Sequence, residues 1–156
     1  RSSENPVYYV QYAHARLASL FRIAEERGIL VSAMNRADLS LLVAPEEFRL
    51  IKHLSSFPCL IESCAKALEV HRVSFYLQEL AGLLHVFYYK HRVLPPKAGD
   101  GKDETIGSGP DEEETEAIRE TVSPALTQAR LALLKQVRTV LSSGLSLLGV
   151  SAPGKM

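Results

Sequence analysis

One stretch of the chain decides the fold class: His71–Leu94, HRVSFYLQELAGLLHVFYYKHRVL. Its apolar side chains recur every three or four residues, at Val73, Leu77, Leu80, Leu84 and Phe87. This is the period of one face of an α-helix, and Gly82 is the single glycine or proline within it. The proline pair at 95–96 ends the run, because a proline cannot donate the backbone hydrogen bond that continues a helix. The pattern predicts one long helix from about His71 to Val93.

Helical patterns on both sides of this stretch predict a bundle. We expect further helices over residues 6–27, 37–42, from 45 onward, 58–69 and 124–147. Asn5 can cap the first of these, Pro6 suits its first turn, and Gly28 can end it. No strand pattern competes with them. The predicted fold class is therefore all-α, a helical bundle of five to six helices that forms a single domain over residues 1–156.

The apolar positions of each helix predict the core. The first helix would use Val10, Leu17, Leu20, Phe21 and Ala24. The helix that begins at Pro45, with two acidic residues favouring its first turn, would use Phe48, Ile51 and Leu54. A separate helix would begin at Pro58 and use Leu60, Ile61, Cys64 and Leu68. The last helix would use Leu126, Ala129, Leu133, Val137, Val140 and Leu141.

Acidic residues concentrate in residues 96–121, a segment rich in Gly, Asp, Glu, Ser and Thr that lacks an apolar period. From Lys97 to Glu120 there are nine acidic and three basic residues, out of 18 of each in the chain. The remainder therefore has 15 basic and nine acidic residues, a net charge of +6. We expect a disordered acidic insert at 96–121 within a domain that is otherwise basic.

The composition argues against a disulfide-stapled scaffold and against a membrane span. Two cysteines, Cys59 and Cys64, are too few for a disulfide framework, and we expect both to pack as small residues. No apolar run reaches the roughly 18 to 20 residues that cross a bilayer, and no basic-then-apolar leader opens the chain. We expect a cytoplasmic protein with no membrane contact.

Catalytic and metal-binding patterns are missing from the sequence. The five histidines form neither a Glu-x-x-His nor a His-Glu-x-x-His spacing. His14 and His85 lie beside apolar stripes, where a hydrogen-bonded helix histidine is the usual explanation. No Gly-x-Ser-x-Gly turn and no phosphate-binding glycine loop occurs. We therefore expect no metal, no cofactor and no catalytic residue in this chain.

Two of the predicted helices carry aromatic and cationic side chains on one face. The first helix has Tyr8, Tyr12 and Arg16, four residues apart. The long helix has His85, Tyr88 and Arg92 near its end. Unstacked RNA bases stack on such rings and guanidinium planes, so the two faces together could form one RNA-binding groove.

The residues alone leave other interpretations open. A tyrosine near a helix end often only exposes its hydroxyl to water, and an arginine often pairs with a neighbouring acid. A helical domain that binds a protein partner in a groove between helices fits the same pattern. A small enzyme with its site in the bundle core fits less well, because the predicted core stripes are almost wholly apolar.

Longer segments resemble a known family. The run NPVYYVQYAHAR, Asn5–Arg16, is similar to the segment that opens the anticodon-binding domain of bacterial arginyl-tRNA synthetases, which are class I aminoacyl-tRNA synthetases. The long helix, from His71-Arg72-Val73 to Arg92-Val93-Leu94, also resembles that domain. So do Ala129-Arg130-Leu131 with Val140-Leu141, and the end of the chain from Leu147 through Gly149 and Pro153 to Met156.

The resemblance implies recognition of the anticodon loop of arginine tRNA. In the family's pattern, the central anticodon base is surrounded by Tyr12, Arg16, Tyr88 and Met156, and Asn5 approaches the loop. Tyr8 and Arg92 stand beside them on the two helices. Candidates for phosphate contacts are Arg22, Lys90, Arg92, Lys135 and Arg138.

The resemblance also implies what this chain lacks. In the family a separate catalytic domain activates arginine with ATP and magnesium, so that domain is an expected partner, and this chain by itself should be inactive and monomeric. A start at Arg1 rather than at a methionine fits an excised fragment. There are three departures from the family's pattern: Gln128-Ala129-Arg130-Leu131 in place of the Asp-Ala-Leu-Arg signature, Gly154 where an acid is common, and the long acidic insert.

Overall fold

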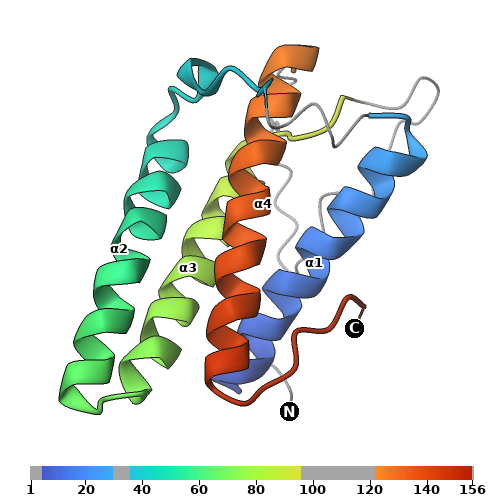
Figure 1. Ribbon diagram of the computed structural model, residues 1–156. Helices are drawn as coiled ribbons and strands as arrows, with labels where there is room; N and C mark the ends of the chain where they lie inside the picture. The colour runs from blue at the N-terminus through green and yellow to red at the C-terminus, as the bar shows by residue number, and fades with distance from the viewer. Residues whose placement is uncertain (1–4, 30–35, 96–121, 156) are drawn as a thin grey trace.

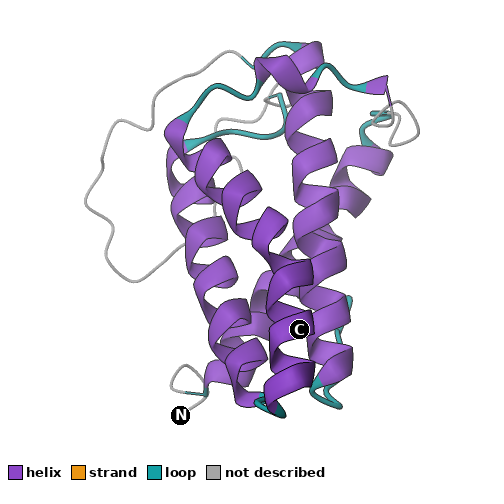
Figure 2. Ribbon diagram, turned by 60° about the vertical axis from the view of Figure 1, so that its left-hand side comes forward, coloured by secondary structure: helices purple, strands orange, loops and turns teal. Residues whose placement is uncertain are grey.

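The computed structural model describes residues 5–29, 36–95 and 122–155. In these ranges it contains the helices α1 Pro6–Glu26, α2 Pro45–Ala67, α3 His71–Lys90 and α4 Pro124–Leu147, with the short 3-10 helix η2 at Leu39–Leu41. No described residue lies in a strand (Figures 1 and 2). The prediction of an all-α bundle is confirmed, although four long helices take the place of the expected five to six. The predicted acidic insert at 96–121 and Met156 lie outside the described residues.

Helices α3 and α4 form the centre of the bundle. Each of them contacts the other three long helices, whereas α1 and α2 pack against both and not against each other. Helices α2 and α3 are antiparallel neighbours joined by a short turn, and the chain after α4 turns back along α1 (Figure 1). None of the helices in the described ranges is long and apolar enough to cross a membrane.

The expected break at Pro58 is wrong, because α2 runs through this proline without interruption. Pro58 is exposed, so the carbonyl that loses its helical partner can bind water instead. The residues on the inner side of the same turns are held by α3. The ring of Tyr76 stacks on that of His53 at a centroid distance of 4.1 Å and lies 5.3 Å from that of Phe57. Its hydroxyl donates to the carbonyl oxygen of His53 at 2.7 Å, so packing overrides the local preference for a break.

The predicted core positions are buried in α1 and α3, but those of α2 are partly wrong. Phe48 is 57% exposed and Leu68, which caps the end of α2, is 88% exposed. The predicted Leu54, Leu60 and Ile61 are partly buried and pack against the core, and the predicted Cys64 is buried together with Glu46, Glu47 and Leu50, which were not predicted. The spacing of apolar residues could not predict this part of the core, because the first two buried residues of α2 are glutamates. Burial of Cys64 is confirmed, whereas Cys59 is exposed and does not pack as expected.

Close packing of α4 on α3 depends on a glycine. A Cβ atom added at Gly144 would lie 2.5 Å and 2.8 Å from the two methyl carbons of Leu77, a side chain that is fully buried. Such distances are well inside van der Waals contact, so the helices can approach this closely only because position 144 has no side chain.

We therefore predict opposite effects of alanine at two helical glycines. Gly144→Ala should be less stable to unfolding than Gly82→Ala by about 1–3 kcal/mol, because overpacking of a core outweighs the gain in helix propensity. Gly82 is the matched control, since an added Cβ there meets no atom within 4 Å. Urea unfolding of both variants and the wild type measures the difference. Equal stabilisation by both substitutions would contradict the proposed close contact.

Candidate nucleic-acid interface

The first turn of α1 is fixed by Asn5 and Pro6. The side-chain oxygen of Asn5 accepts a hydrogen bond from the backbone N–H of Val7 at 3.0 Å, and Pro6 occupies the first helical position, where its missing N–H leaves no bond unmade. Asn5, which was expected to approach RNA, is exposed. It therefore combines a capping role with a position at the rim of the bundle.

Helices α1 and α3 meet at Arg16 and Tyr88. The central carbon of the Arg16 guanidinium lies 4.7 Å from the centroid of the Tyr88 ring. A guanidinium over an aromatic face is a cation–π contact, worth about 0.5 to 2 kcal/mol depending on its exposure to water. These two residues, which come from different helices and were expected to share one site, are thus in direct contact.

The hydroxyl of Tyr88 is buried and has no hydrogen-bond partner among the residues that the structure describes. Burial raises the pKa of this hydroxyl well above its usual range, and the nearby charge of Arg16 opposes that shift only in part. The group therefore stays protonated and can donate. A buried polar atom left without a partner costs about 1–3 kcal/mol, and in native structures such an atom calls for an explanation.

Tyr12 is the most exposed of the three tyrosines expected to line this surface. It lies one turn before Arg16 on α1 and is 45% exposed, whereas Tyr8 is half-buried and Tyr88 is only 8% exposed. Tyr12 and Tyr88 were both expected to offer a face for stacking. In this structure one face of the Tyr88 ring is covered by Arg16, so the two tyrosines are not equivalent.

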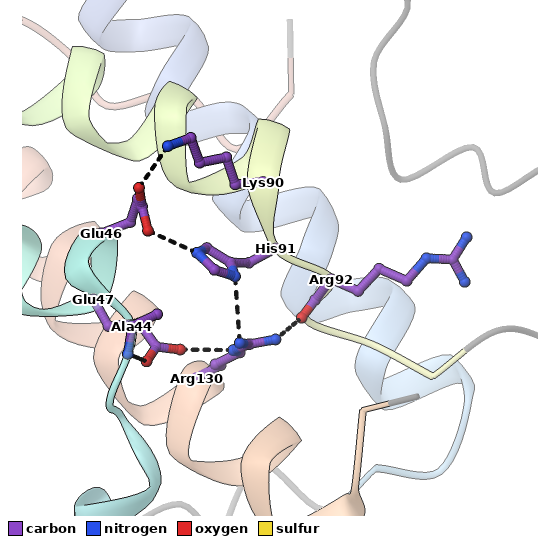
Figure 3. A network of polar contacts seen from close by, with 7 residues as sticks. All are labelled: Ala44, Glu46, Glu47, Lys90, His91, Arg92 and Arg130. Carbon is purple, nitrogen blue, oxygen red and sulfur yellow. Dashed lines mark hydrogen bonds and ion pairs between the residues drawn. The ribbon is translucent and has the colours of Figure 1, made fainter. Parts of the chain in front are cut away.

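A network of polar side chains surrounds the end of α3 (Figure 3). Glu46, at the start of α2, accepts from the ammonium group of Lys90 at 2.8 Å and pairs with Nε2 of His91 at 3.0 Å. Both of these hydrogen bonds stabilise the ionised carboxylate and lower the pKa of Glu46 to about 2. Because Lys90 is the last residue of α3, this ion pair fixes the end of α3 against the beginning of α2.

A buried ion pair completes the network. Nε of Arg130, on α4, donates to Glu47 at 2.7 Å, and these residues are 2% and 1% exposed. Another guanidinium nitrogen of Arg130 donates to the backbone carbonyl of Arg92 at 2.6 Å. The second carboxylate oxygen of Glu47 accepts from the backbone N–H of Ala44 at 2.8 Å. Arg130 thus joins α4 to the start of α2 and to the residues just after α3.

The side chain of Arg92 points away from this network, while its carbonyl oxygen faces Arg130 (Figure 3). Arg92 was expected to lie beside the RNA site, and the network holds its backbone rather than its guanidinium. The sequence marked Arg130 as part of a run that resembles the family's last helix and of a departure from its signature, and marked Glu47 as a favourable acid at a helix start. The sequence offered one indication of the ion pair between Glu47 and Arg130: each of these charged residues lies within a predicted amphipathic helix.

The other expected phosphate contacts differ in their surroundings. Arg22 pairs with Glu26 at 2.9 Å on the surface, and the guanidinium of Arg138 lies 5.8 Å from the centroid of the Phe21 ring. Lys135 is exposed. Arg22 and Arg138 thus each contact another side chain of the protein, and Lys135 is open to solvent.

In the part of the chain that the structure describes, no group of three His, Cys, Asp or Glu side chains is arranged to hold a metal ion. His14 is buried and hydrogen-bonded to the carbonyl of Pro153, as expected for a helix histidine, whereas His85 is exposed.

Comparison with known proteins identifies the family of this chain. A sequence profile of the DALR anticodon binding domain matches residues 10–104 and 114–156. The chain belongs to this family. Among curated relatives of the domain, an arginine–tRNA ligase of Geobacter metallireducens is 49% identical over 156 residues, all of this chain and 23% of the relative. An arginine–tRNA ligase of Frankia alni is 46% identical over the same length, 24% of that protein.

Solved structures agree with this family assignment. The arginyl-tRNA synthetase of Thermus thermophilus matches 95% of the chain with a TM-score of 0.60 and 29% identity, over 21% of its own length. A Campylobacter jejuni protein assigned as an arginyl-tRNA synthetase matches all of the chain with a TM-score of 0.70 and 25% identity, over 27% of its length. The chain thus spans about a quarter of the length of the relatives that share this domain.

The ion pairs of Glu46 predict how the domain responds to acid. A carboxyl whose pKa is 4.5 when unfolded and about 2 when folded adds stability that is complete above about pH 4.5 and is lost as the pH falls toward 2. Glu46→Gln should therefore be less stable than the wild type at pH 6, with a difference that shrinks below pH 4.5. Urea unfolding at several pH values measures this.

Glu62→Gln is the matched control, because Glu62 forms an exposed pair with Lys66 on the same helix. Exposed pairs add little to stability, so this variant should follow the wild type at every pH. A difference between Glu46→Gln and the wild type that stays constant from pH 6 to pH 2.5 would show that the ionised form of Glu46 is not the stabilising one.

Proposed function

We propose that this chain binds the anticodon loop of arginine tRNA as the anticodon-binding domain of an arginine–tRNA ligase. Membership in the DALR anticodon binding domain family and the names of the relatives support this. The observation that carries it is local: the exposed ring of Tyr12 lies one helical turn from Arg16, whose guanidinium rests on Tyr88. An open ring beside a held guanidinium is the kind of surface on which an unstacked RNA base binds.

In the proposed complex Tyr12 stacks on the central anticodon base. Arg16 is held on the Tyr88 ring, so its position is set before RNA arrives, and its planar group presents N–H donors toward the base edge or a phosphate. Asn5 and Tyr8 line the N-terminal side of α1, and Arg92 lies at the end of α3. Met156 would pack against the base, as the family's pattern implies.

The hydroxyl of Tyr88 gains a partner in this proposal. In the free domain it is buried and has no hydrogen-bond partner among the described residues. The hydroxyl stays protonated, so it can donate to an acceptor on a base that reaches it beside Arg16. The unmet hydrogen bond of the free domain then becomes a source of affinity that only a suitable RNA can use.

The rest of such a ligase would supply the chemistry. Activation of arginine with ATP and magnesium belongs to the catalytic domain, which is the second proposed partner, and this domain needs no cofactor of its own. We place the enzyme in the cytoplasm and treat the domain as a monomer. Because the full enzyme also holds other parts of the tRNA, the domain alone should bind the loop more weakly than the enzyme binds tRNA.

The proposal predicts base-specific binding by this chain. An arginine-tRNA anticodon stem-loop should shift the NMR signals of Tyr12 and Tyr88 more than a stem-loop with a changed central base. Tyr12→Ala should weaken binding of the correct loop about 5- to 150-fold, because stacking on an aromatic ring contributes on the order of 1 to 3 kcal/mol. Titration at two salt concentrations separates this effect from phosphate attraction.

Phe75→Ala is the control for that variant, since Phe75 is an exposed aromatic residue at the opposite end of α3 from Tyr88 and should not affect binding. Equal or absent shifts with the two loops at low salt would refute base recognition by this chain. Binding that ignores both RNA sequence and salt would favour a protein-interaction domain instead.

A second prediction concerns the Tyr88 hydroxyl. Tyr88→Phe should not lower the free energy of unfolding, because it removes a buried group without a partner, yet it should weaken binding of the correct loop about 2- to 12-fold, the loss of one hydrogen bond. Tyr76→Phe is the matched control, since that hydroxyl donates to a carbonyl within the bundle. It should lower stability and leave RNA affinity unchanged; the reverse outcome for the two tyrosines would exclude a role for the Tyr88 hydroxyl.

A further inference from the structure

The chain after α4 is tied to α1 by two side chains far away in sequence. The side-chain amide of Gln11 donates to the carbonyl oxygen of Ser151 at 2.8 Å. Nδ1 of His14 lies 2.8 Å from the carbonyl oxygen of Pro153, and because a carbonyl can only accept, Nδ1 carries the proton and donates. Both donors come from α1, and both acceptors come from the backbone of residues 149–155, which we call the tail.

The tail has no regular structure that would hold it in place by itself. Helix α4 ends at Leu147, and Gly149 turns the chain with a φ of 71°. The backbone N–H of Val150 still bonds back to Leu145, at 2.9 Å, and Val150 and Ala152 pack against the core. Beyond this point the path of the tail along α1 follows the bonds from Gln11 and His14.

The order of these bonds gives the direction of the tail. Residue 11 meets residue 151 and residue 14 meets residue 153, so the tail runs parallel to α1, as Figure 1 also shows. Continuing in this direction, Gly154 and Lys155 approach the level of Arg16, the residue that rests on Tyr88. Lys155 is exposed, so the tail, having passed the level of Tyr12, brings a cation toward Arg16.

We infer that Gln11 and His14 are positioning residues for RNA binding, which act by holding the tail against α1 so that its end completes the site of Tyr12 and Arg16. This inference rests on the proposed function. Neither side chain needs to touch RNA. Each hydrogen bond holds the tail in place before RNA binds. The loss of conformational entropy then occurs on folding and does not weaken binding.

The test uses the same stem-loop titration with variants of the chain. Gln11→Met keeps the length of the side chain and removes the donor, and His14→Leu does the same for the imidazole. Each should weaken binding about 2- to 12-fold, the effect of one hydrogen bond, and should lower the NMR order parameters of the backbone at Gly154 and Lys155. His14→Asn should restore affinity, because its amide nitrogen takes nearly the place of Nδ1.

Two controls separate positioning from other effects. Gln78→Met removes a glutamine whose side-chain amide donates to Ser74 on the same helix. It should change neither the affinity for the stem-loop nor the mobility of the tail. In a chain that ends at Val150, Gln11→Met should also have no effect on affinity, because the tail through which it acts is missing.

The outcomes are distinct. A loss of affinity with Gln11→Met that persists in the shortened chain would mean that Gln11 acts on RNA directly, and would overturn the inference. Unchanged affinity in both single variants would overturn it as well, while leaving the proposed function intact if the wild type still prefers the correct loop. A wild-type chain that prefers neither loop would overturn the proposed function and this role together.

Discussion

The ion pair between Arg130 and Glu47 is the contact on which the arrangement of the helices depends. A guanidinium that is 2% exposed has lost its hydration and must find partners inside the protein. It finds them in a carboxylate at the start of α2 and in the carbonyl of Arg92 just beyond α3. Removing one partner of such a pair typically costs about 3–5 kcal/mol, because the other charge stays buried. The buried guanidinium is therefore satisfied only when α4 lies against both the start of α2 and the residues just after α3.

The same short segment at the end of α3 belongs both to this network and to the surface that we propose to face RNA. Tyr88 faces α1 and lies under Arg16, while Lys90 and His91 turn toward Glu46 on α2. The backbone of Arg92 then faces α4. Tyr88 and Lys90 belong to the last turn of α3, whereas His91 is extended and leads the chain out of the helix, so this short segment contacts three helices. The position of Tyr88 in the candidate site is therefore coupled to ion pairs on the other side of α3.

Sequence periodicity predicted what depends on neighbours along the chain. The buried faces of α1 and α3 followed from apolar spacing, and Asn5 with Pro6 marked the start of α1. The buried face of α2 did not follow, because two of its members are glutamates that only a distant lysine and arginine make acceptable. Pro58 also stayed inside a helix because of contacts with Tyr76.

The candidate site shows the same division. Aromatic and cationic spacing marked one face with Tyr8, Tyr12 and Arg16 and another with His85, Tyr88 and Arg92, and the family resemblance singled out Tyr12, Arg16 and Tyr88 among them. The structure brings Arg16 and Tyr88 into contact. The spacing could not show that Arg16 covers the ring of Tyr88. Nor could it show that the tail returns to α1, because the two bonds that hold the tail join residues 139 or 140 positions apart. Such contacts are fixed only when the whole bundle closes.

Three of the cations described above have partners within the protein, and this affects how RNA would be recognised. The ammonium of Lys90 is paired with Glu46, the guanidinium of Arg130 is buried, and Arg22 has Glu26 beside it. Each phosphate that a protein neutralises on a single strand adds about 0.7 to the slope of affinity against salt. Because carboxylates of the protein neutralise part of this charge, we expect these three residues to contribute little to phosphate attraction. In the proposed complex, the ring of Tyr12 and the guanidinium of Arg16 on Tyr88 would then recognise one base.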